Sequence, residues 1–408
     1  MASGALDNLL PRFDQRGMDL GLERMHLAMA DLTLPGRRRP AIQVAGTNGK
    51  GSICSFIASA LQQTPFKAGI TTSPHLVSWC ERIRIDAELI PLDELRQLLS
   101  DQTPLTQQHR LTPFEQLLIA AFSHFEQHNV DLLVLEVGLG GRLDATTAYP
   151  WRPVIAFGAI GLDHREHLGH SIEAIAREKA AVIHPGATVI SAAQEPEVAA
   201  ILQTTCRQHN AKLHWVQPLP TSWTLGLAGS WQRSNAAVAL GALQALAPLG
   251  FPVPTSAIRE GFEQASWPGR LQDGTWKGHP LRLDGAHNPP AARQLAQELQ
   301  HDAEEHSTAQ CWILAIQSHK QAVDMLQHLL GPNDDVWIVP VPGHQSWTAE
   351  RLVAEQPHWS AQLHDAASAE EALEALAQRS TWPEPAPLIA GSLYLIGDLL
   401  GSGQVTAK

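Results

Sequence analysis

A glycine-rich loop between a buried strand and a helix narrows the possible folds of this chain more than any other segment. The apolar run Ala41–Ala45 predicts the strand, and the stretch from about Ser52 to Leu61 predicts the helix. Between them the chain reads Gly46-Thr47-Asn48-Gly49-Lys50-Gly51-Ser52. Backbone N–H groups of such a loop, with the start of the next helix, form a cradle for an anion, to which Lys50 adds a positive charge for the β- and γ-phosphates. The order of strand, loop and helix therefore favours an ATP-binding α/β domain over an ordinary glycine-rich turn.

The α/β pattern continues along the chain and divides it into two domains. Buried strands alternate with helices, which is typical of parallel βαβ units. The Pro268-Gly269 step interrupts this pattern, so we expect a first domain over 1–268 and a second over 269–408. The predicted fold is a phosphate-loop domain with a mainly parallel sheet, followed by a smaller Rossmann-like α/β domain. The expected strands are 41–45, 132–137, 154–160, 188–191, 281–283, 312–316, 336–339 and 388–390, and the expected helices are 52–61, 113–127, 171–183, 289–299, 322–329 and 369–378.

Composition excludes several classes of protein. A formal net charge of -12 argues against a nucleic-acid partner and against an anionic membrane surface. No apolar run approaches the roughly 20 residues that span a bilayer, and residues 1–24 lack the apolar core of a secretory signal. The four cysteines are scattered without a CxxC pair, which predicts neither a disulfide framework nor a cysteine zinc site. We therefore expect a cytoplasmic protein.

Seven further blocks, in order along the chain, resemble one family. The phosphate loop departs from the pattern GxxxxGK[ST], because Val44 stands at the first glycine and Gly51 follows Lys50. This compact form resembles the loop of the Mur ligase superfamily, and the blocks are similar to those of its folylpolyglutamate synthase/dihydrofolate synthase branch. The blocks are 72–76 (TSPHL), 112–115 (TPFE), 136–146 (EVGLGGRLDAT), 161–164 (GLDH), 178–180 (EKA), 284–289 (DGAHNP) and 391–394 (GSLY).

The resemblance implies an ATP-dependent ligase that joins L-glutamate to dihydropteroate or to the glutamyl tail of a folate through an acyl phosphate. It also implies two Mg²⁺ ions, with K⁺ as a further candidate cation, and a monomer. Residues matching the family's catalytic positions are Lys50, Lys179 and His164. Those matching its ATP-binding positions are residues 46–52, Asn235, Arg270, Asp284 and His287. Those matching its Mg²⁺ ligands are Ser73, Glu136, His164 and Lys179, the last as a carbamate.

Two of these residues also stand out on physical grounds. Glu136 ends an apolar strand, and the carboxyl ends of strands are where α/β sheets bind ligands. Lys179 lies four residues after Ile175, on the apolar stripe of the helix predicted over 171–183. A lysine on an inward face needs a partner or a modification, unless its stem carries the ammonium group out to water.

The folate-binding segments and the second domain are less tightly specified. The resemblance implies pterin contacts from Thr112, Pro113, Phe114, Glu115, Leu143, Asp144 and Ala145, although the Phe114 ring fits a core position equally well. Arg270 would contact ATP and couple its binding to domain closure. The chain departs from the family pattern at 318–321, at 343–346 and at Trp231, which leaves the glutamate-binding residues open.

Two alternatives remain from the sequence. One is a cell-wall precursor ligase of the same superfamily, but such enzymes usually carry a nucleotide-sugar domain before the loop, and 45 residues precede Gly46 here. The other is an inactive nucleotide-binding relative, which the retained loop lysine and metal-binding positions disfavour.

Overall fold

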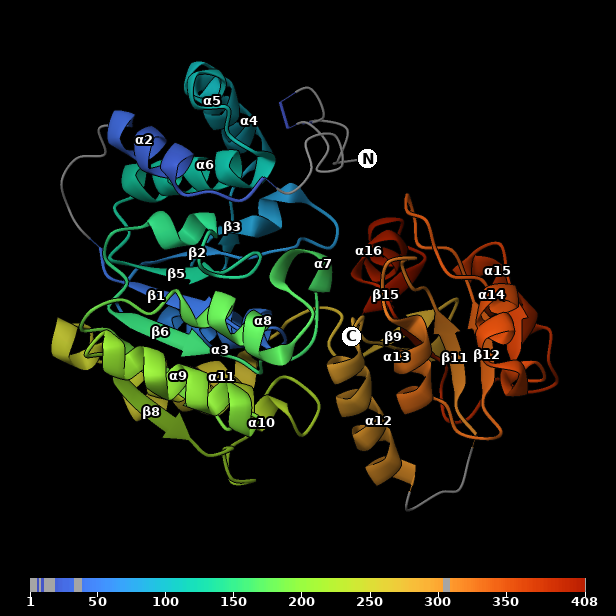
Figure 1. The fold of residues 1–408 in the computed structure, drawn as a ribbon. Coiled ribbons are helices and arrows are strands. Elements are labelled where there is room, and N and C mark those ends of the chain that lie inside the picture. The colour runs from blue at the N-terminus through green and yellow to red at the C-terminus, as the bar shows by residue number, and fades with distance from the viewer. Residues whose placement is uncertain (1–5, 7–8, 11–18, 33–38, 304–308, 408) are drawn as a thin grey trace. The chain divides into compact units, whose positions relative to one another are not determined.

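The computed structural model describes residues 6, 9–10, 19–32, 39–303 and 309–407, which form two compact units (Figure 1). The first unit comprises Met1–Gly226 and Trp231–Ser266. The second comprises Trp267–Lys408 and a short segment, Leu227–Ser230, that the chain contributes before returning to the first unit. The second unit thus begins beside the Pro268-Gly269 step, whereas nothing in the sequence pattern indicated the earlier segment.

The first unit is built on an eight-stranded sheet in the order β4-β3-β2-β5-β1-β6-β7-β8. The six strands from β2 to β8 in this order are parallel, and β3 and β4 extend one edge as antiparallel strands. The predicted mainly parallel sheet is therefore confirmed. The strands are β1 (Ala41–Ala45), β2 (Ala68–Thr71), β3 (Ile83–Ile85), β4 (Glu88–Leu89), β5 (Leu132–Glu136), β6 (Val154–Phe157), β7 (Thr188–Ala192) and β8 (Lys212–Val216).

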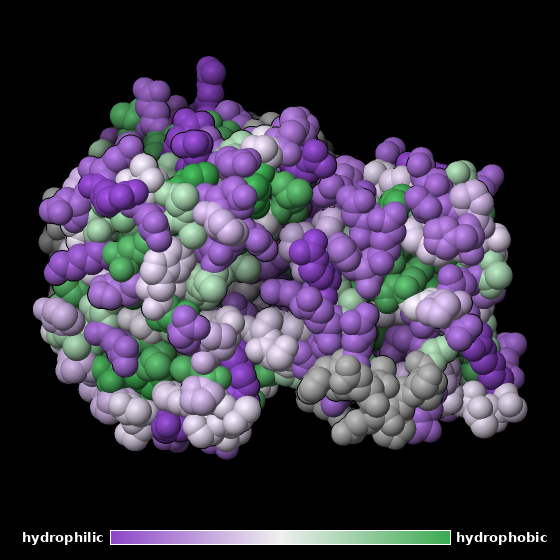
Figure 2. Space-filling view, turned by 60° about the horizontal axis from the view of Figure 1, so that its bottom comes forward, coloured by the Kyte–Doolittle hydropathy of each residue, from purple (hydrophilic) through white to green (hydrophobic). Residues whose placement is uncertain are grey.

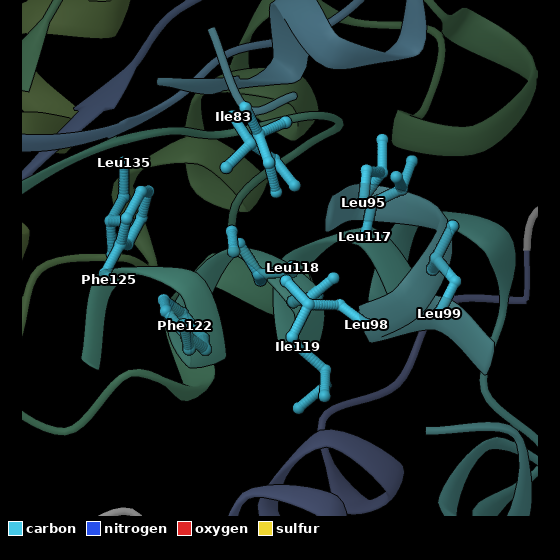
Figure 3. Close-up of a cluster of buried hydrophobic side chains, with 14 of the residues drawn as sticks. Ile83, Leu95, Leu98, Leu99, Leu117, Leu118, Ile119, Phe122, Phe125 and Leu135 are labelled. Carbon is cyan, nitrogen blue, oxygen red and sulfur yellow. The ribbon is translucent and has the colours of Figure 1, made fainter. Parts of the chain in front are cut away.

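Helices cover both faces of this sheet. One face carries α3 (Lys50–Gln62) and α10 (Gln232–Gln244), which pack against each other and against the strands, and α11 (Thr255–Gln264) packs against α3. The other face carries α6 (Pro113–Gln127), α8 (Ile172–Ala180) and α9 (Pro196–Gln208). Beyond α6 lie α2 (Glu23–Asp31), α4 (Leu92–Asp101) and α5 (Thr103–His109), and Figure 3 shows leucines of α4 and α6 sharing one buried apolar cluster.

The connections around β1 create the place where a ligand can bind. β1 lies between β5 and β6, and the chain passes from β1 over β5 to β2, but later crosses from β5 to β6 on the other side. Where successive connections leave in opposite directions, a crevice opens at the carboxyl ends of the strands. Residues 46–52 follow β1 at that edge, and Glu136 ends β5 beside them.

The second unit contains a seven-stranded sheet in the order β13-β12-β11-β14-β10-β9-β15. The five strands from β13 to β10 are parallel, and β9 and β15 add an antiparallel edge. Its strands are β9 (Gln272–Trp276), β10 (His279–Leu283), β11 (Cys311–Leu314), β12 (Asp335–Ile338), β13 (Leu363–Asp365), β14 (Leu388–Ala390) and β15 (Val405–Ala407). Its helices are α12 (Pro289–Ala303), α13 (Ala322–Leu329), α14 (Ala349–Glu355), α15 (Ala369–Ala377) and α16 (Leu393–Gly401).

Several predicted elements end earlier than expected. The helix predicted over 171–183 ends at Ala180, because Val182 N–H and Ile183 N–H donate to carbonyls three residues back, at Lys179 and Ala180. Such bonds tighten a last turn into a 3₁₀ arrangement, here just before Pro185. The strands predicted to reach Ile160 and Ile316 end at Phe157 and Leu314, where the chain leaves the sheet for the site loops.

The surface is mixed in character. On the face shown in Figure 2, hydrophobic residues form scattered patches among hydrophilic ones. Exposed large hydrophobic side chains such as Leu27, Val77 and Tyr394 come from separate parts of the chain. Within the described residues, no helix combines the length and the apolar character needed to cross a membrane.

Candidate active site

The phosphate loop is pressed against the segment that follows β6. Thr47 N–H and Asn48 N–H both donate to Ala159 O, at 2.8 and 3.1 Å. A Cβ on Gly158 would lie 2.4 Å from Asn48 O, so only glycine allows the two backbones to come this close. Thr47 Oγ1 also donates to Gly161 O and accepts from Gly161 N–H, each at 3.0 Å. The loop at 46–52 is therefore tied to the block at 161–164, as both strand ends lie at one edge of the sheet.

Helix α3 begins directly at the loop, with its N-terminal N–H groups on the loop side. Gly49 is its N-cap and adopts the left-handed conformation, with φ of 84°. The first N–H groups of a helix have no partner within the helix and attract anions. Lys50 folds back over the loop, where its Nζ donates to Thr47 O at 3.1 Å. The arrangement is the one that the sequence predicts for binding a phosphate chain.

A buried amide chain from α10 supports the loop from behind. Asn235 Nδ2 donates to Gln232 Oε1 at 2.9 Å, and Gln232 Nε2 donates to Ser52 Oγ at 3.3 Å. Gln232 is fully buried, and the sequence motifs did not predict its place in the site. Its spacing of three residues from Asn235 on one helix face was the available signal. The structure thus connects Asn235 to the loop through a residue that was not among the predicted site residues.

We expect Gly49→Ala to disturb this contact strongly. A Cβ at position 49 would lie 2.3 Å from Asn235 Oδ1, and the left-handed backbone adds strain. The free energy of unfolding should fall by about 1–3 kcal/mol, with a weakened affinity for ATP. Chemical denaturation and nucleotide titration measure the two effects. Asn235→Ala removes the clashing side chain, so it should lower the free energy of unfolding less in the Gly49→Ala variant than in the wild type. Losses that simply add in the double variant would contradict this account.

Lys179 is buried and reaches the phosphate loop. Its Nζ donates to Gly46 O at 2.9 Å, and the side chain is only 5% exposed. Burial and the nearby positive charge of Lys50 lower the pKa of Lys179 to about 7, although Asp163 and Asp144 oppose this shift. The inward position predicted from its spacing to Ile175 is therefore observed. An amine with so low a pKa is substantially neutral at physiological pH.

Glu136 and Ser73 are brought together at the carboxyl end of β5. Glu136 is buried, pairs with Val44 in register, and accepts a hydrogen bond from Ser73 N–H at 2.8 Å. The carboxylate therefore leaves the sheet beside the start of the phosphate loop. His164 directly precedes α7 (Arg165–Leu168), and its backbone N–H donates to Asp163 Oδ1 at 2.8 Å. Its ring lies 3.8–3.9 Å from the carboxylates of Asp163 and Glu166.

The two predicted folate segments meet at Gly138. A Cβ there would lie 2.9 Å from the Phe114 ring and 3.3 Å from Asp144 Oδ2, so both side chains border this position. Phe114 is partly exposed at the rim of the buried cluster around α6. Thr112 and Glu115 form a capping box at the start of α6, and Glu115 also pairs with Arg24 at 3.2 Å.

Asp144 organises the loop after β5 from within. Its two carboxylate oxygens accept from the N–H groups of Gly138, Leu139 and Thr146 at 2.9–3.0 Å, and from Thr146 Oγ1 at 2.5 Å. Burial raises the pKa of Asp144 despite these bonds. Ala145 is buried beside it, and Leu143 is partly exposed. The structure therefore gives Asp144 a loop-shaping role, while Phe114 and Leu143 keep exposed surface.

In the second unit, three predicted ATP-binding residues surround Gly285. Arg270 Nη1 donates to Gly269 O at 2.9 Å and would lie 2.3 Å from a Cβ on Gly285. Asp284 is buried and accepts from the N–H groups of Leu271 and Ala286, each at 2.8 Å, and burial raises its pKa against the opposing charge of Arg270. His287 Nδ1 donates to Gly285 O at 2.7 Å. The sequence block thus forms one compact turn after β10.

The two segments that depart from the family pattern also lie side by side in this unit. Ser318 N–H donates to Gln345 O at 2.9 Å, and Trp347 Nε1 donates to Lys320 O at 3.1 Å. They follow β11 and β12 at the carboxyl edge of the second sheet. The departures therefore affect one local structure and are not scattered through the unit.

Comparison with known proteins supports the family suggested by these motifs. The Mur ligase middle domain matches residues 44–213, and the dihydrofolate synthetase C-terminal domain matches residues 270–402. The dihydrofolate synthetase of Saccharomyces cerevisiae is 30% identical, over 94% of this chain and 97% of its own length. The structure of Escherichia coli FolC in complex with DHPP and ADP is 28% identical with a TM-score of 0.82, covering 98% of this chain and 96% of that one.

A further solved structure is the bifunctional folylpolyglutamate synthase/dihydrofolate synthase of Yersinia pestis, complexed with AMPPNP and Mn ion. It is 26% identical, with a TM-score of 0.80, and the match covers 98% of this chain and 97% of that one. The matches extend over both units and contain the motif blocks in order. The chain therefore belongs to the dihydrofolate synthase/folylpolyglutamate synthase family of the Mur ligase superfamily.

Proposed function

We propose that this protein is an ATP-dependent ligase that joins L-glutamate by an amide bond to dihydropteroate, to the glutamyl tail of a folate, or to both. The observation that carries the proposal is the buried contact of Lys179 with Gly46 in the phosphate loop, beside Lys50. Dihydropteroate is the favoured acceptor, because the second unit matches the C-terminal domain of dihydrofolate synthetase and the yeast relative is a dihydrofolate synthetase. The proposal also takes the enzyme to be monomeric and cytoplasmic.

The reaction has two steps, and neither requires a covalent bond between the substrate and a protein side chain. A carboxylate oxygen of the acceptor attacks the γ-phosphorus of ATP, the bond to the β,γ-bridging oxygen breaks, and ADP and an acyl phosphate form. The amine of glutamate then attacks the acyl carbon, phosphate leaves, and the amine loses a proton. Such a reaction depends mainly on positioning and on stabilising the charge of the transferred phosphoryl group. Lys50 and the N–H groups at the start of α3 would bind that charge.

The residues at the end of β5 fit a hard divalent cation. Glu136 supplies a buried carboxylate and Ser73 a hydroxyl group on a segment held by the same carboxylate, and oxygen donors of this kind suit Mg²⁺. When bound, Mg²⁺ would neutralise negative charge on the nucleotide and the phosphoryl group. We propose Ser73, Glu136 and His164 as its ligands. The Yersinia pestis relative was solved in complex with AMPPNP and Mn ion, which agrees with the use of a divalent cation.

Lys179 fits the carbamate implied by the family resemblance. A carbamate forms when a neutral amine attacks CO₂ and releases a proton, so a pKa of about 7 makes the reaction accessible near neutral pH. The product replaces a buried and largely neutral amine beside Lys50 with a negative charge, which provides a partner for Lys50 and an oxygen ligand for a cation. Activity should fall in CO₂-free buffer and return when bicarbonate is added; activity indifferent to both treatments would contradict the carbamate but leave the ligase proposal intact.

The direct test supplies both acceptors side by side. Purified protein with ATP, Mg²⁺ and L-glutamate should release ADP only when dihydropteroate or tetrahydrofolate is also present, and mass spectrometry should show products heavier by one glutamyl residue or more. Omitting glutamate is the matched control for unproductive ATP hydrolysis. ADP release that needs neither substrate, or ligation of an amino acid to a UDP-sugar peptide, would overturn the proposal in favour of one of the two alternatives.

A substitution at Phe114 tests whether its ring contacts the pterin. We expect Phe114→Leu to raise the KM for dihydropteroate about tenfold with little change in the KM for ATP, because a ring-stacking contact of about 1 kcal/mol or more is lost. Ser368→Ala is the structural control, since it removes the N-cap of α15 in the second unit and should lower the free energy of unfolding by about 1 kcal/mol without changing the KM for dihydropteroate. An unchanged KM for dihydropteroate in Phe114→Leu would show that the ring serves the core alone.

A further inference from the structure

A second candidate metal site lies in the first unit, away from the phosphate loop. Glu94 of α4, and His124 and His128 at the end of α6, place one ligand atom each within 4.8 Å of one another. The start of α6 lies at the carboxyl edge of the sheet, because Phe114 touches Gly138 beyond the end of β5. His128 lies fourteen positions after Phe114, so at a rise of about 1.5 Å per residue the cluster is roughly 20 Å from Phe114 along the helix.

Contacts of His128 also place the cluster at the opposite edge of the sheet. Lys67 directly precedes β2, and its Nζ donates to His128 O at 3.1 Å. Lys67 N–H donates to Asp131 Oδ2, and Asp131 directly precedes β5. Both are at the amino ends of parallel strands, whereas the phosphate loop follows the carboxyl end of β1. The cluster is therefore separate from the expected catalytic ligands Ser73, Glu136 and His164.

The geometry of the cluster resembles a preformed chelate. His124 and His128 are four residues apart and face the same side of α6, with ring centroids 4.3 Å apart. Glu94 Oε1 lies 2.6 Å from His124 Nδ1 and 3.8 Å from His128 Nδ1. Two imidazoles and a carboxylate form a donor set that Zn²⁺ binds with N and O distances of about 2.0–2.2 Å. Ligand atoms around a tetrahedral ion of this kind are about 3.3 Å apart. Small rotations of the side chains would therefore bring the three ligand atoms to the distances that the ion needs.

The surroundings hold the ligands in place but leave room for water. His128 Nδ1 donates to His124 O at 3.0 Å, so binding of the ion through Nδ1 requires its proton to move to Nε2 and this bond to break. The leucines after Glu94 on α4 pack against α6 in the buried cluster of Figure 3, so the two ligand-bearing helices are fixed relative to one another. His124 is buried, whereas the side chains of Glu94 and His128 are 27% and 40% exposed. Water can therefore reach an ion there and complete its coordination.

We propose that Glu94, His124 and His128 bind one Zn²⁺ ion, or a similar transition-metal ion such as Co²⁺ or Ni²⁺, and thereby link α4 to α6. The ion replaces the proton shared between His124 and Glu94, which is released to solvent. The site is structural: it stabilises the folded chain because it is assembled only when the two helices pack. The positive charge of Lys67 nearby works against the ion and limits its affinity. The proposal does not depend on the ligase activity.

The test is metal binding by the full chain after treatment with a chelator. Isothermal titration with Zn²⁺, in excess Mg²⁺ to occupy hard-cation sites, should show one equivalent that is absent in His128→Ala. Co²⁺ should give visible absorption bands of a low-coordinate site, lost in the same variant. The matched control is His109→Ala. His109 also pairs with a carboxylate, that of Asp31 at 2.7 Å, but no other His, Cys, Asp or Glu among the described residues completes a metal-binding group with this pair. The His109→Ala variant should still bind one equivalent of Zn²⁺.

Stability provides a second readout that does not depend on the catalytic metal. Zn²⁺ at one hundred times its dissociation constant should raise the free energy of unfolding by about 2.7 kcal/mol in the wild type and in His109→Ala, but not in His128→Ala or Glu94→Gln. Equal Zn²⁺ stoichiometry and equal stabilisation in the wild type and in His128→Ala would overturn the proposal. Because His128 is partly exposed, loss of folding is not expected to obscure this comparison.

Discussion

Replacing Lys179 with methionine should abolish ligation while making the protein more stable. Methionine keeps the approximate length and the apolar stem of the side chain but removes the buried amine beside Lys50. We expect glutamate-dependent ADP formation to fall about 10³-fold or more, because the oxygen ligand that a carbamate would supply is lost. The free energy of unfolding at pH 7 should rise by about 1–4 kcal/mol, because burying an amine that is charged in the unfolded chain costs free energy and burying methionine does not.

The stability change should depend on pH in a defined direction. Burial lowers the pKa of Lys179 to about 7 in the folded protein, from an ordinary value of 10.5. Between these values the unfolded chain binds more protons, so the wild type gains stability from this group as the pH rises. The advantage of Lys179→Met should therefore be largest at or below pH 7 and shrink toward pH 10.

Denaturation in CO₂-free buffer across this pH range is the measurement. Lys212→Met, at an exposed position in β8, is the control and should change neither activity nor stability appreciably. A Lys179→Met variant that is less stable than the wild type at every pH would show that the ammonium group stabilises the loop. Retained ligation would remove Lys179 from the mechanism.

The second large effect is expected for Lys50→Ala. Lys50 contributes the positive charge of the phosphate loop and is the first residue of α3. Its removal should lower the rate of ADP formation by about 10²–10³-fold, the range found when one group that stabilises transition-state charge is deleted. Alanine is a good helix former, so the free energy of unfolding should change little.

Single-turnover phosphoryl transfer with dihydropteroate is the sharpest measurement of this effect. Lys50→Arg keeps the charge but not the compact ammonium group, and should recover part of the rate relative to Lys50→Ala. Near-normal, glutamate-dependent ADP release by Lys50→Ala would contradict the proposed function itself. Loss of activity in Lys50→Ala with intact Zn²⁺ binding at Glu94, His124 and His128 would confirm that the two sites are independent.

The parts of the fold that the sequence predicts well are those with strong local signals. Central parallel strands such as β5 and β6 are continuous apolar runs, because both faces of the sheet are covered. Strands outside the centre lack that signal: β2 reads Ala-Gly-Ile-Thr, and β9 reads Gln-Asp-Gly-Thr-Trp. The segment Leu227–Ser230 joins the second unit through tertiary contacts that no local pattern encodes.

The candidate site also has parts that the sequence predicts and parts that it does not. The loop at 46–52 and the strand-end Glu136 can be found from short patterns, because their chemistry is local. Gln232 contacts Ser52 across 180 positions of sequence, and such a contact leaves no trace in a single chain. The block Thr112–Glu115 also has the spacing of a capping box, and the structure shows this box at the start of α6. The pterin contact of the same block stays a prediction.

The position of β1 has a consequence for how this chain folds during its synthesis on the ribosome. β1 pairs only with β5 and β6, which begin at Leu132 and Val154. At ordinary rates of translation, both edges of the newly made strand wait roughly 5–20 s for their partners. Until then both edges of β1 are unpaired, and unpaired strand edges are prone to mispairing and aggregation.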